Sequence, residues 1–356
     1  MKLKSLLFGS AAALVAVSGA RAADAVVIPE PEAVEYVRVC DAAGTGYFYI
    51  PGTETCLRIS GFVRYQMDFA GGDDYIEYDD LGAPTPVSGT QDGWDKEYNI
   101  RLGFEAWNDT ELGPLYSHIR FYAGGAATDR PLGDGTVMVD RAYFTLAGVT
   151  MGFNDTFWDI GFGGPADIYN NYFTTTGMVA YTANVGDWAF TVSLEDDGSA
   201  NWMPSVVGVA SGSIGSLGLT LAAVYDDTAG ATGGGDWSLQ GAATYEMGKV
   251  ALGAGFQYSG APGTGNYQAS YDWVIGGDAS IQATDKLNLG IGTQYAINEL
   301  GSSDDDWALG AIATYEVVSG LETELRIQWM EDTYNTTFDT TDSQGWNARL
   351  RFTRSF

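Results

Sequence analysis

The sequence predicts an all-β protein, a transmembrane barrel of sixteen antiparallel strands. Runs of about ten residues with period-2 apolarity recur from residue 57 to the C-terminus. Short turns and longer Gly- and Asp-rich loops join these runs alternately, as in barrels with short periplasmic turns and long external loops. In the clearest runs, aromatic residues stand at both ends of a stripe of small apolar residues. This arrangement is typical of strands that cross a bilayer.

Residues 1–22 have the pattern of a removable export signal. Lys2 and Lys4 form a positive start, Leu6–Val17 is a short apolar stretch, and Ala20–Ala22 matches the A-x-A cleavage site. We therefore expect Sec export and removal of this segment.

Composition and charge narrow the class of protein further. The 356-residue chain has 46 acidic and 17 basic residues; without the three basic residues of the signal, 14 basic residues remain and the net charge is −32. This balance argues against a nucleic-acid partner, because phosphates require a basic surface. After the signal, no apolar run reaches the 18 residues of a membrane helix.

Residues 23–56 are expected to form a lead into the barrel that ends in a disulfide-closed loop. Cys40 and Cys56 enclose 15 residues that include several glycines and one proline, so the chain can turn back. An oxidising periplasm favours the bond, and closing a loop of this size removes about 3 kcal/mol of unfolded-chain entropy.

Residues 57–356 are expected to form the barrel itself, with eight long and seven short connections between the strands. The strands should begin near Leu57, Glu97, Leu115, Val137, Val149, Met178, Trp188, Ser205, Leu217, Asp236, Val250, Tyr271, Lys286, Asp306, Leu321 and Gln344. A soluble sandwich would also alternate, but sixteen near-regular hairpins are too many for one sandwich.

Two similar strands support a membrane setting. Asp236–Glu246 and Asp306–Glu316 match at seven of eleven positions, and each has a Trp and a Tyr eight residues apart on one face. Eight residues span about 26 Å along a strand, or about 20 Å of height after tilting, close to the ~25 Å apolar band of such barrels. The C-terminal strand alternates in the same way and closes on Phe356.

Strand parity predicts a basic wall inside the barrel. Eight arginines point inward from the first four and the last two strands, which closure of the barrel brings together. They are Arg58, Arg64, Arg101, Arg120, Arg141, Arg326, Arg349 and Arg351.

The third long connection, Phe157–Gly177, is the candidate for the opposite side of a constriction. It contains Asp159 and Asp167, and Asp155 precedes it. A sixteen-strand barrel encloses a channel wider than side chains can fill, so an inward-folded loop would narrow it. Loop acids facing wall arginines would create a transverse field, and lining charges set ion selectivity. From these residues alone, an ordinary solvated surface loop is equally compatible.

The N-terminal region resembles that of the alphaproteobacterial (rhizobial-type) general porins. The similarity covers Tyr36–Asp41, Gly46–Arg58 and Gly61–Tyr65, and continues more loosely to Phe356. It implies a homotrimeric outer-membrane barrel for passive diffusion, with the third loop folded into each pore.

Two further segments are similar to functional parts of general porins. Arg141–Phe144 resembles their arginine-bearing wall strand, and Phe162–Gly164 resembles the turn of their constriction loop. Gly161 stands where some enterobacterial porins have an acid, so the resemblance does not settle which loop acid faces the wall.

The expected function is therefore a porin, a water-filled outer-membrane channel for ions and small hydrophilic solutes with a weak preference for cations. A substrate-specific channel, for example for oligosaccharides, is the main alternative; it would need a row of lumenal aromatic residues, for which Phe62, Trp107, Tyr116, Tyr122 and Tyr143 are scattered candidates. An outer-membrane lipase and a soluble lectin are less favoured.

No catalytic, cofactor or metal site is expected in the barrel. His118 is the only histidine, and its neighbour Ser117 points to the opposite face of the strand, so the two cannot form a nucleophile–base pair. Pairs of aspartates recur in the long connections. A solvated acidic rim is the simpler interpretation; Ca²⁺ or Mg²⁺ that bridges these acids to lipopolysaccharide is the alternative.

Overall fold

The computed structural model describes residues 38–72, 74–78, 84–88, 93–126, 137–167, 175–199, 202–230, 234–298, 305–332 and 343–356. The chain divides into two units, Met1–Arg38 and Val39–Phe356. Only Arg38 of the first unit is described, so the predicted signal peptide lies outside the described residues.

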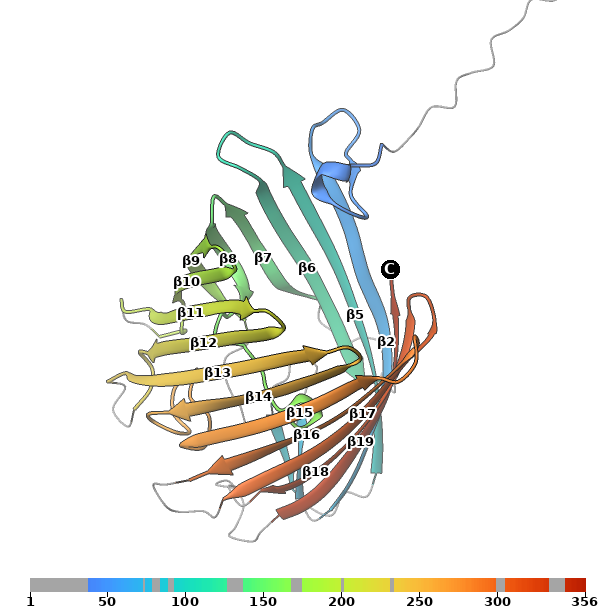
Figure 1. Ribbon diagram of the computed structural model, residues 1–356, viewed down its shortest axis with the longest axis vertical. Coiled ribbons are helices and arrows are strands. Elements are labelled where there is room, and N and C mark those ends of the chain that lie inside the picture. The colour runs from blue at the N-terminus through green and yellow to red at the C-terminus, as the bar shows by residue number, and fades with distance from the viewer. Residues whose placement is uncertain are drawn as a thin grey trace, which may run out of the picture. The chain divides into compact units, whose positions relative to one another are not determined.

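The second unit is a closed antiparallel barrel of sixteen strands, which confirms the predicted fold class (Figure 1). The barrel strands are β2 (Cys56–Gly72), β5 (Gly93–Asn108), β6 (Leu115–Ala126), β7 (Met138–Leu146), β8 (Val149–Asp155), β9 (Thr175–Val185), β10 (Trp188–Glu195), β11 (Ser205–Ile214), β12 (Leu217–Asp226), β13 (Asp236–Met247), β14 (Val250–Ser259), β15 (Trp273–Gln282), β16 (Leu287–Ile297), β17 (Asp306–Val318), β18 (Leu321–Asp332) and β19 (Ser343–Ser355). Each begins within four residues of its predicted start.

Neighbouring strands in the sequence pair with each other, and the barrel closes where β19 pairs with β2. Phe356 extends this seam, since its backbone N–H donates to Gly61 O at 3.0 Å and its carbonyl accepts from Gly61 N at 3.1 Å. A terminal alternating strand thus completes the ring, and neither end of the sheet is left as a free edge.

Four small elements were not predicted. Within the first long connection, β3 (Asp74–Tyr78) and β4 (Pro84–Ser88) pair as a separate hairpin. Before the barrel, β1 (Phe48–Tyr49) pairs with the start of β2, next to the short 3₁₀ helix η1 (Asp41–Ala43). Runs of two to five residues are too short for periodicity to detect.

The predicted disulfide between Cys40 and Cys56 is present, with Cα atoms 5.9 Å apart. Both half-cystines are fully buried, and they pack with Tyr47 and Trp107. The disulfide loop therefore has a small core of its own at the start of β2.

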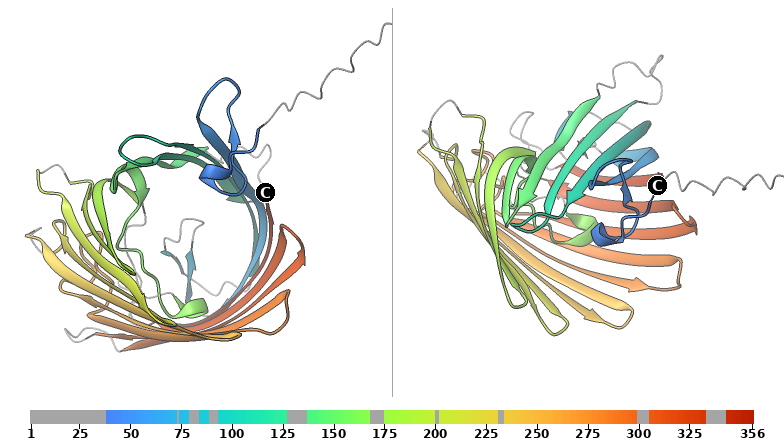
Figure 2. Two further views of the ribbon diagram at one scale, coloured as in Figure 1. Left: turned by 45° about the horizontal axis from the view of Figure 1, so that its top comes forward. Right: turned by 90° about the horizontal axis from the view of Figure 1, so that it is seen from above.

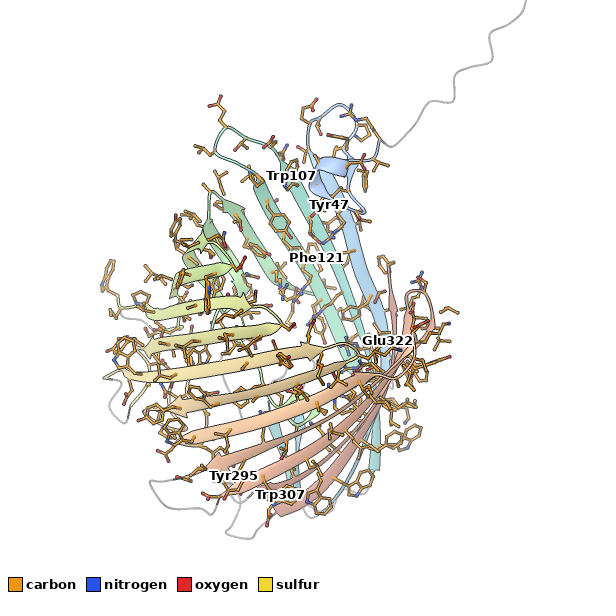
Figure 3. The ribbon with its side chains drawn as sticks, in the orientation of Figure 1. Tyr47, Trp107, Phe121, Tyr295, Trp307 and Glu322 are labelled. Atoms are coloured by element: carbon orange, nitrogen blue, oxygen red, sulfur yellow. A yellow bond between two sulfur atoms is a disulfide. The ribbon has the colours of Figure 1, made fainter. Side chains whose placement is uncertain are left out.

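The two faces of the barrel strands differ as the alternation predicts. On β13, Trp237 and Tyr245 are 57% and 44% exposed, whereas Ser238 and Gln240 between them are fully buried. On β17, Trp307 is likewise outward, beside Tyr295 of the neighbouring strand β16 (Figure 3). The outside is thus apolar with aromatic ends, and the polar face surrounds the lumen.

Candidate functional site: the barrel lumen

The structure places all eight predicted arginines on the lumenal face of six neighbouring strands. Their outward neighbours confirm the parity: Ile59 and Val63 beside Arg58 and Arg64 are 44% and 51% exposed on the outer surface. Closure of β19 onto β2 joins the arginines of β18 and β19 to those of β2, β5, β6 and β7. We call this continuous surface the arginine wall.

Acids inside the wall, which the parity analysis overlooked, hold several of these arginines. Glu105 on β5 lies opposite Arg58 and accepts hydrogen bonds from Arg58 Nη2 at 2.5 Å and 2.7 Å. Tyr47 and Tyr116 donate to the same carboxylate at 2.8 Å and 3.0 Å. Burial and the adjacent Glu105 raise the pKa of Tyr47 to about 12, so its hydroxyl remains a donor at any physiological pH.

Similar pairs continue along the wall. Arg349 Nε lies 2.6 Å from Asp68 Oδ1, and Arg326 Nε lies 3.4 Å from Glu324 Oε1. Arg351 instead donates to the buried amide oxygen of Gln66 at 2.8 Å and 3.0 Å. The wall is thus a set of ion pairs and hydrogen bonds with an excess of arginine.

A β-bulge in β7 brings a further acid into the lumen. The register between β6 and β7 shifts after Arg120, and Asp140 occupies the extra position. Its carboxylate is 2.7 Å from Arg120 Nη2 and 3.7 Å from Arg101 Nε. Simple alternation assigns Asp140 to the lipid face, so only the structure could find it.

The root of the third long connection also contacts the wall. Asp155 ends β8 and forms an ion pair with Arg141 of β7, whose Nε donates to Asp155 Oδ1 at 3.1 Å. Asp155, one of the three predicted loop acids, is thus bound to a wall arginine. Arg141 therefore helps to fix the point where the loop leaves the wall.

From this root the loop crosses the inside of the barrel. Its described part, residues 156–167, leads to the short helix η2 (Gly164–Ala166), which lies against β15–β18 (Figure 2, left). Gln294 Nε2 donates to Phe162 O at 2.9 Å, and Gln328 Nε2 donates to Pro165 O. The loop is therefore inside the barrel, and the alternative of a solvated surface loop is wrong.

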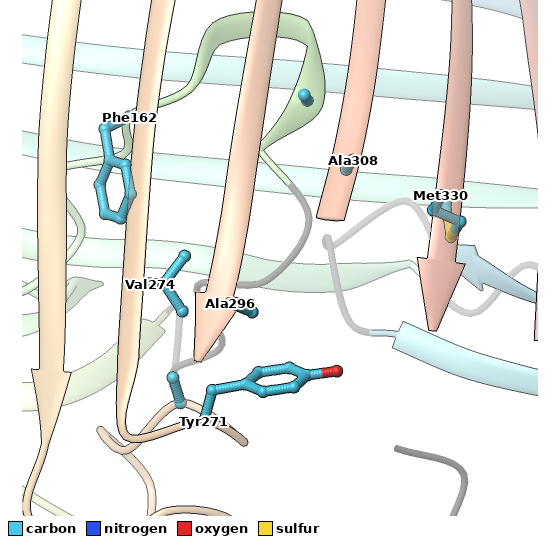
Figure 4. Packing of buried hydrophobic residues seen from close by; sticks show 8 residues of the cluster. Phe162, Tyr271, Val274, Ala296, Ala308 and Met330 are labelled. Carbon is cyan, nitrogen blue, oxygen red and sulfur yellow. The ribbon is translucent and has the colours of Figure 1, made fainter. Parts of the chain in front are cut away.

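Glycines on the far wall let the loop backbone lie directly on the strands. A Cβ atom on Gly292 would lie 2.0 Å from Gly163 O, and one on Gly310 would lie 2.6 Å from Pro165. Phe162 packs beside them in a buried cluster that includes Val274 and Met330 (Figure 4). The loop tip is thus seated by shape as well as by hydrogen bonds.

The other two loop acids are exposed in the lumenal segment. Asp159 follows the buried Trp158, and Asp167 follows η2 and accepts a hydrogen bond from Gln294 Nε2 at 3.0 Å. Gln294 belongs to β16, so Asp167 sits on the side of the barrel that carries the loop tip.

A second loop, between β14 and β15, also folds inward. Tyr267 in this loop is fully buried and packs with Trp158 of the third connection and Val207 of β11. Its hydroxyl donates to Glu195 Oε2 at 2.9 Å, and Glu195 also accepts from Thr156 Oγ1 at 2.5 Å. Burial and the charge of Glu195 raise the pKa of Tyr267. The sequence signal for this loop was a tyrosine in a Gly-rich connection, too weak to be recognised.

His118 lies among aromatic side chains of the wall. Its ring centroid is 5.8 Å from that of Tyr143 and 6.4 Å from that of Tyr116. Across the wall, Arg64 lies 4.4 Å above the ring of Phe62. Of the aromatic candidates, Phe62 and Tyr122 lie against arginines and Tyr116 and Tyr143 against His118, whereas Trp107 packs against the disulfide.

The described residues contain no group of three or more His, Cys, Asp or Glu arranged to hold a metal ion. Nor does the described part of the chain include a helix long and apolar enough to cross a membrane. Asp196-Asp197 and Asp226-Asp227 are two of the aspartate pairs in the long connections, and each caps its loop. Asp226 accepts hydrogen bonds from the backbone of Thr228, Asn266 and Tyr267, and Asp197 accepts one from Ser199 N. Asp73, Asp79, Asp80 and Asp304 lie outside the described residues.

Comparison with known proteins identifies the family of this barrel. The sequence profile of the porin subfamily matches residues 24–350. The chain belongs to the porin subfamily. Porin Omp2a of Brucella suis biovar 1 (strain 1330) is 35% identical over 398 residues that cover both chains completely. Porin Omp2a of Brucella ovis is 38% identical over 362 residues, which cover 90% of this porin and 96% of the relative. The predicted resemblance to alphaproteobacterial porins is thus confirmed.

Solved structures show the same fold at low sequence identity. The outer membrane channel DcaP of Acinetobacter baumannii aligns with a TM-score of 0.66 and 14% identity, covering 86% of this porin and 99% of that chain. OmpF of Salmonella typhi, in complex with daunomycin, aligns with a TM-score of 0.61 and 12% identity, covering 85% of this porin and 98% of that chain. OmpT of Vibrio cholerae in a trimer form aligns with a TM-score of 0.56 and 12% identity, covering 85% of this porin and 100% of that chain. The porin is an outer-membrane protein.

Proposed function

We propose that this porin is a passive channel for ions and small hydrophilic solutes and that it prefers cations weakly. The observation that supports the proposal is the inward loop, which carries exposed Asp159 and Asp167 through a lumen whose other side is the arginine wall. Both signs of charge line the path, so neither ion is strongly excluded. The net charge of −32 after signal removal enriches cations at the mouth.

Reversal potentials under a KCl gradient test this proposal. Replacement of Arg64, Arg141 and Arg351 by Ala should raise the cation preference, because the loop acids lose their counter-charges. Replacement of Asp159 and Asp167 by Asn should lower it or shift it toward anions. If the arginine variant has the reversal potential of the wild type, the wall does not line the narrowest section.

The assembly is proposed to be a homotrimer. Family membership and the trimeric OmpT neighbour support it, and closed cyclic symmetry suits a membrane ring. Outward residues of the first and last strands, such as Val63, Ile119 and Leu350, would form the contact. Cross-linking in cells and the mass in mild detergent test this; a monomer in both would contradict it.

A substrate-specific channel, for example for oligosaccharides, is the second candidate. The observation in its favour is that Tyr116, His118 and Tyr143 form one aromatic patch beside the arginines. Conductance that a sugar blocks in a saturable manner would favour this function, whereas a linear dependence of solute flux on concentration would favour the general channel.

At the external rim, binding of lipopolysaccharide through Ca²⁺ or Mg²⁺ remains a proposal. The acidic connections and the net charge support it, since hard divalent cations bind carboxylate oxygens. Thermal stability that rises with Ca²⁺ in lipopolysaccharide-containing vesicles, and not in plain ones, would support this bridge.

A further inference from the structure

Asp140 and Arg141 are neighbours in the chain, yet both side chains face the lumen. In a regular strand one of them would face lipid. The bulge prevents this: Arg120 of β6 lies opposite Arg141, Phe121 lies opposite Val139, and Asp140 is the extra residue between them. Val139 is 48% exposed on the outer surface, whereas Asp140 is only 6% exposed.

The bulge inserts a carboxylate among three arginines. Both oxygens of Asp140 accept from Arg120 Nε at 2.9 Å, and Arg101 Nε is 3.7 Å away. Without this carboxylate, Arg120 and Arg141 would form a directly opposed cross-strand pair of like charges, which is unfavourable.

Several other charged or titratable groups lie near this point. Glu105 lies opposite His118 and is paired with Arg58, Tyr122 lies against Arg101, and Tyr143 contacts His118. Asp155 neutralises Arg141 from β8, and His118 lies on β6 two residues before Arg120. Three arginines and two aspartates therefore leave one net positive charge on this part of the wall. The wall is much less positive here than its arginines alone would make it.

We propose that Asp140 is a selectivity-determining residue, and that the bulge exists in this porin to place its charge in the lumen. This inference rests on the proposed channel function. A passing ion experiences the sum of the nearby charges, so the carboxylate reduces the attraction of Arg101 and Arg120 for anions and their repulsion of cations.

Asp140→Asn tests the proposal, because asparagine keeps the shape and one acceptor oxygen but removes the charge. The K⁺ to Cl⁻ permeability ratio should fall by about threefold at low salt, as expected for one charge several ångströms from the path. The difference in permeability ratio between the variant and the wild type should shrink as the salt concentration rises, because the Debye length falls from about 30 Å at 0.01 M to about 3 Å at 1 M.

A charge-matched control is Asp187→Asn, an exposed acid in the turn between β9 and β10, which should leave the ratio unchanged. Asp140→Glu should behave like wild type. The double variant Asp140→Asn with Arg120→Gln restores the original sum of charges and should return the ratio to the wild-type value. Arg120→Gln alone should raise the ratio. If Asp140→Asn alone forms no channels, the double variant is compared with Arg120→Gln, and an equal ratio in these two variants would overturn the inference.

An unchanged ratio in Asp140→Asn channels of normal conductance would overturn the inference. A double variant that remains as shifted as Asp140→Asn would also overturn it, because the effect would then come from altered structure. By contrast, wild-type protein that forms no ohmic channel would refute the proposed function itself, so the two failures are distinguishable.

Discussion

Glu105 illustrates how single residues set the character of the lumen. It is 5% exposed, and Arg58, Tyr47 and Tyr116 all donate hydrogen bonds to it. One carboxylate thus joins the disulfide loop, β2 and β6. The wall arginines are held in fixed positions by such partners, and this is why a lumen lined with many charges can still be stable.

Glu105→Gln is predicted to lower the free energy of unfolding by about 1–3 kcal/mol, because three donors would share one neutral acceptor and the new amide would face donors. Urea titration of the protein in vesicles measures this. Glu322→Gln on the exposed rim is the matched control and should have no effect (Figure 3). Equal urea concentrations at the unfolding midpoint for Glu105→Gln and wild type would contradict the structural role given to Glu105.

Several site residues could be predicted from sequence because strand parity is local information. The eight arginines lie where alternation places them, since period-2 alternation holds over most of each strand. Asp140 could not be predicted, because a bulge changes parity and depends on pairing with β6. Glu105 was accessible in principle, since it shares the parity of Arg101.

At the scale of elements, two inward loops divide the lumen. The third connection crosses from β8 to η2, and the β14–β15 loop packs on it through Tyr267. The tip of the third connection rests on β15–β18, and Tyr267 packs near β11. The sequence suggested the inward fold of the first loop but not where its tip binds. The contacts of the tip join residues more than a hundred positions apart, such as Phe162 and Gln294, and these contacts leave no local pattern in the sequence.

Gly292→Ala is predicted to lower the single-channel conductance. The added methyl group would lie 2.0 Å from Gly163 O, so the loop tip must move away from β16 and toward the arginine wall. Gly208→Ala is the control, because a Cβ there would meet no atom closer than 4.0 Å. A conductance equal to that of the control would show that the tip does not bound the pore.

Tyr267→Ala should have the opposite effect and raise the conductance. It removes the side chain that packs on Trp158 and the hydrogen bond to Glu195, so the space behind the third connection opens. A large-to-small change of this kind also costs about 3–5 kcal/mol. Single-channel recordings at matched salt check the first effect and urea titration the second; unchanged conductance with the stability loss would limit Tyr267 to a structural role.

For the whole molecule, the disulfide loop is predicted to stabilise the barrel and to have no effect on conduction. The variant Cys40→Ser with Cys56→Ser should lose about 3 kcal/mol of stability, because the 15-residue loop regains its unfolded entropy. Its single-channel conductance should stay at the wild-type value, since the loop packs at the start of β2. Free thiols in the wild-type protein, found by peptide mapping, would contradict the bond.

The order and number of strands were predictable from sequence, because runs of period-2 alternation recur along the chain and closure follows from the strand count. The hairpin β3–β4 and the seating of the loop tip on Gly292 and Gly310 were not, since short runs and close backbone contacts leave no periodic signal.

The central claim is that this barrel is an open aqueous channel with charges of both signs at its constriction. Single-channel recording of the purified wild-type protein in a planar bilayer, under a KCl gradient, tests it most directly. The predicted result is ohmic conductance steps with a reversal potential that shows weak cation preference. The absence of any current steps after the protein is added, or a reversal potential close to that of a strictly anion-selective pore, would contradict the claim.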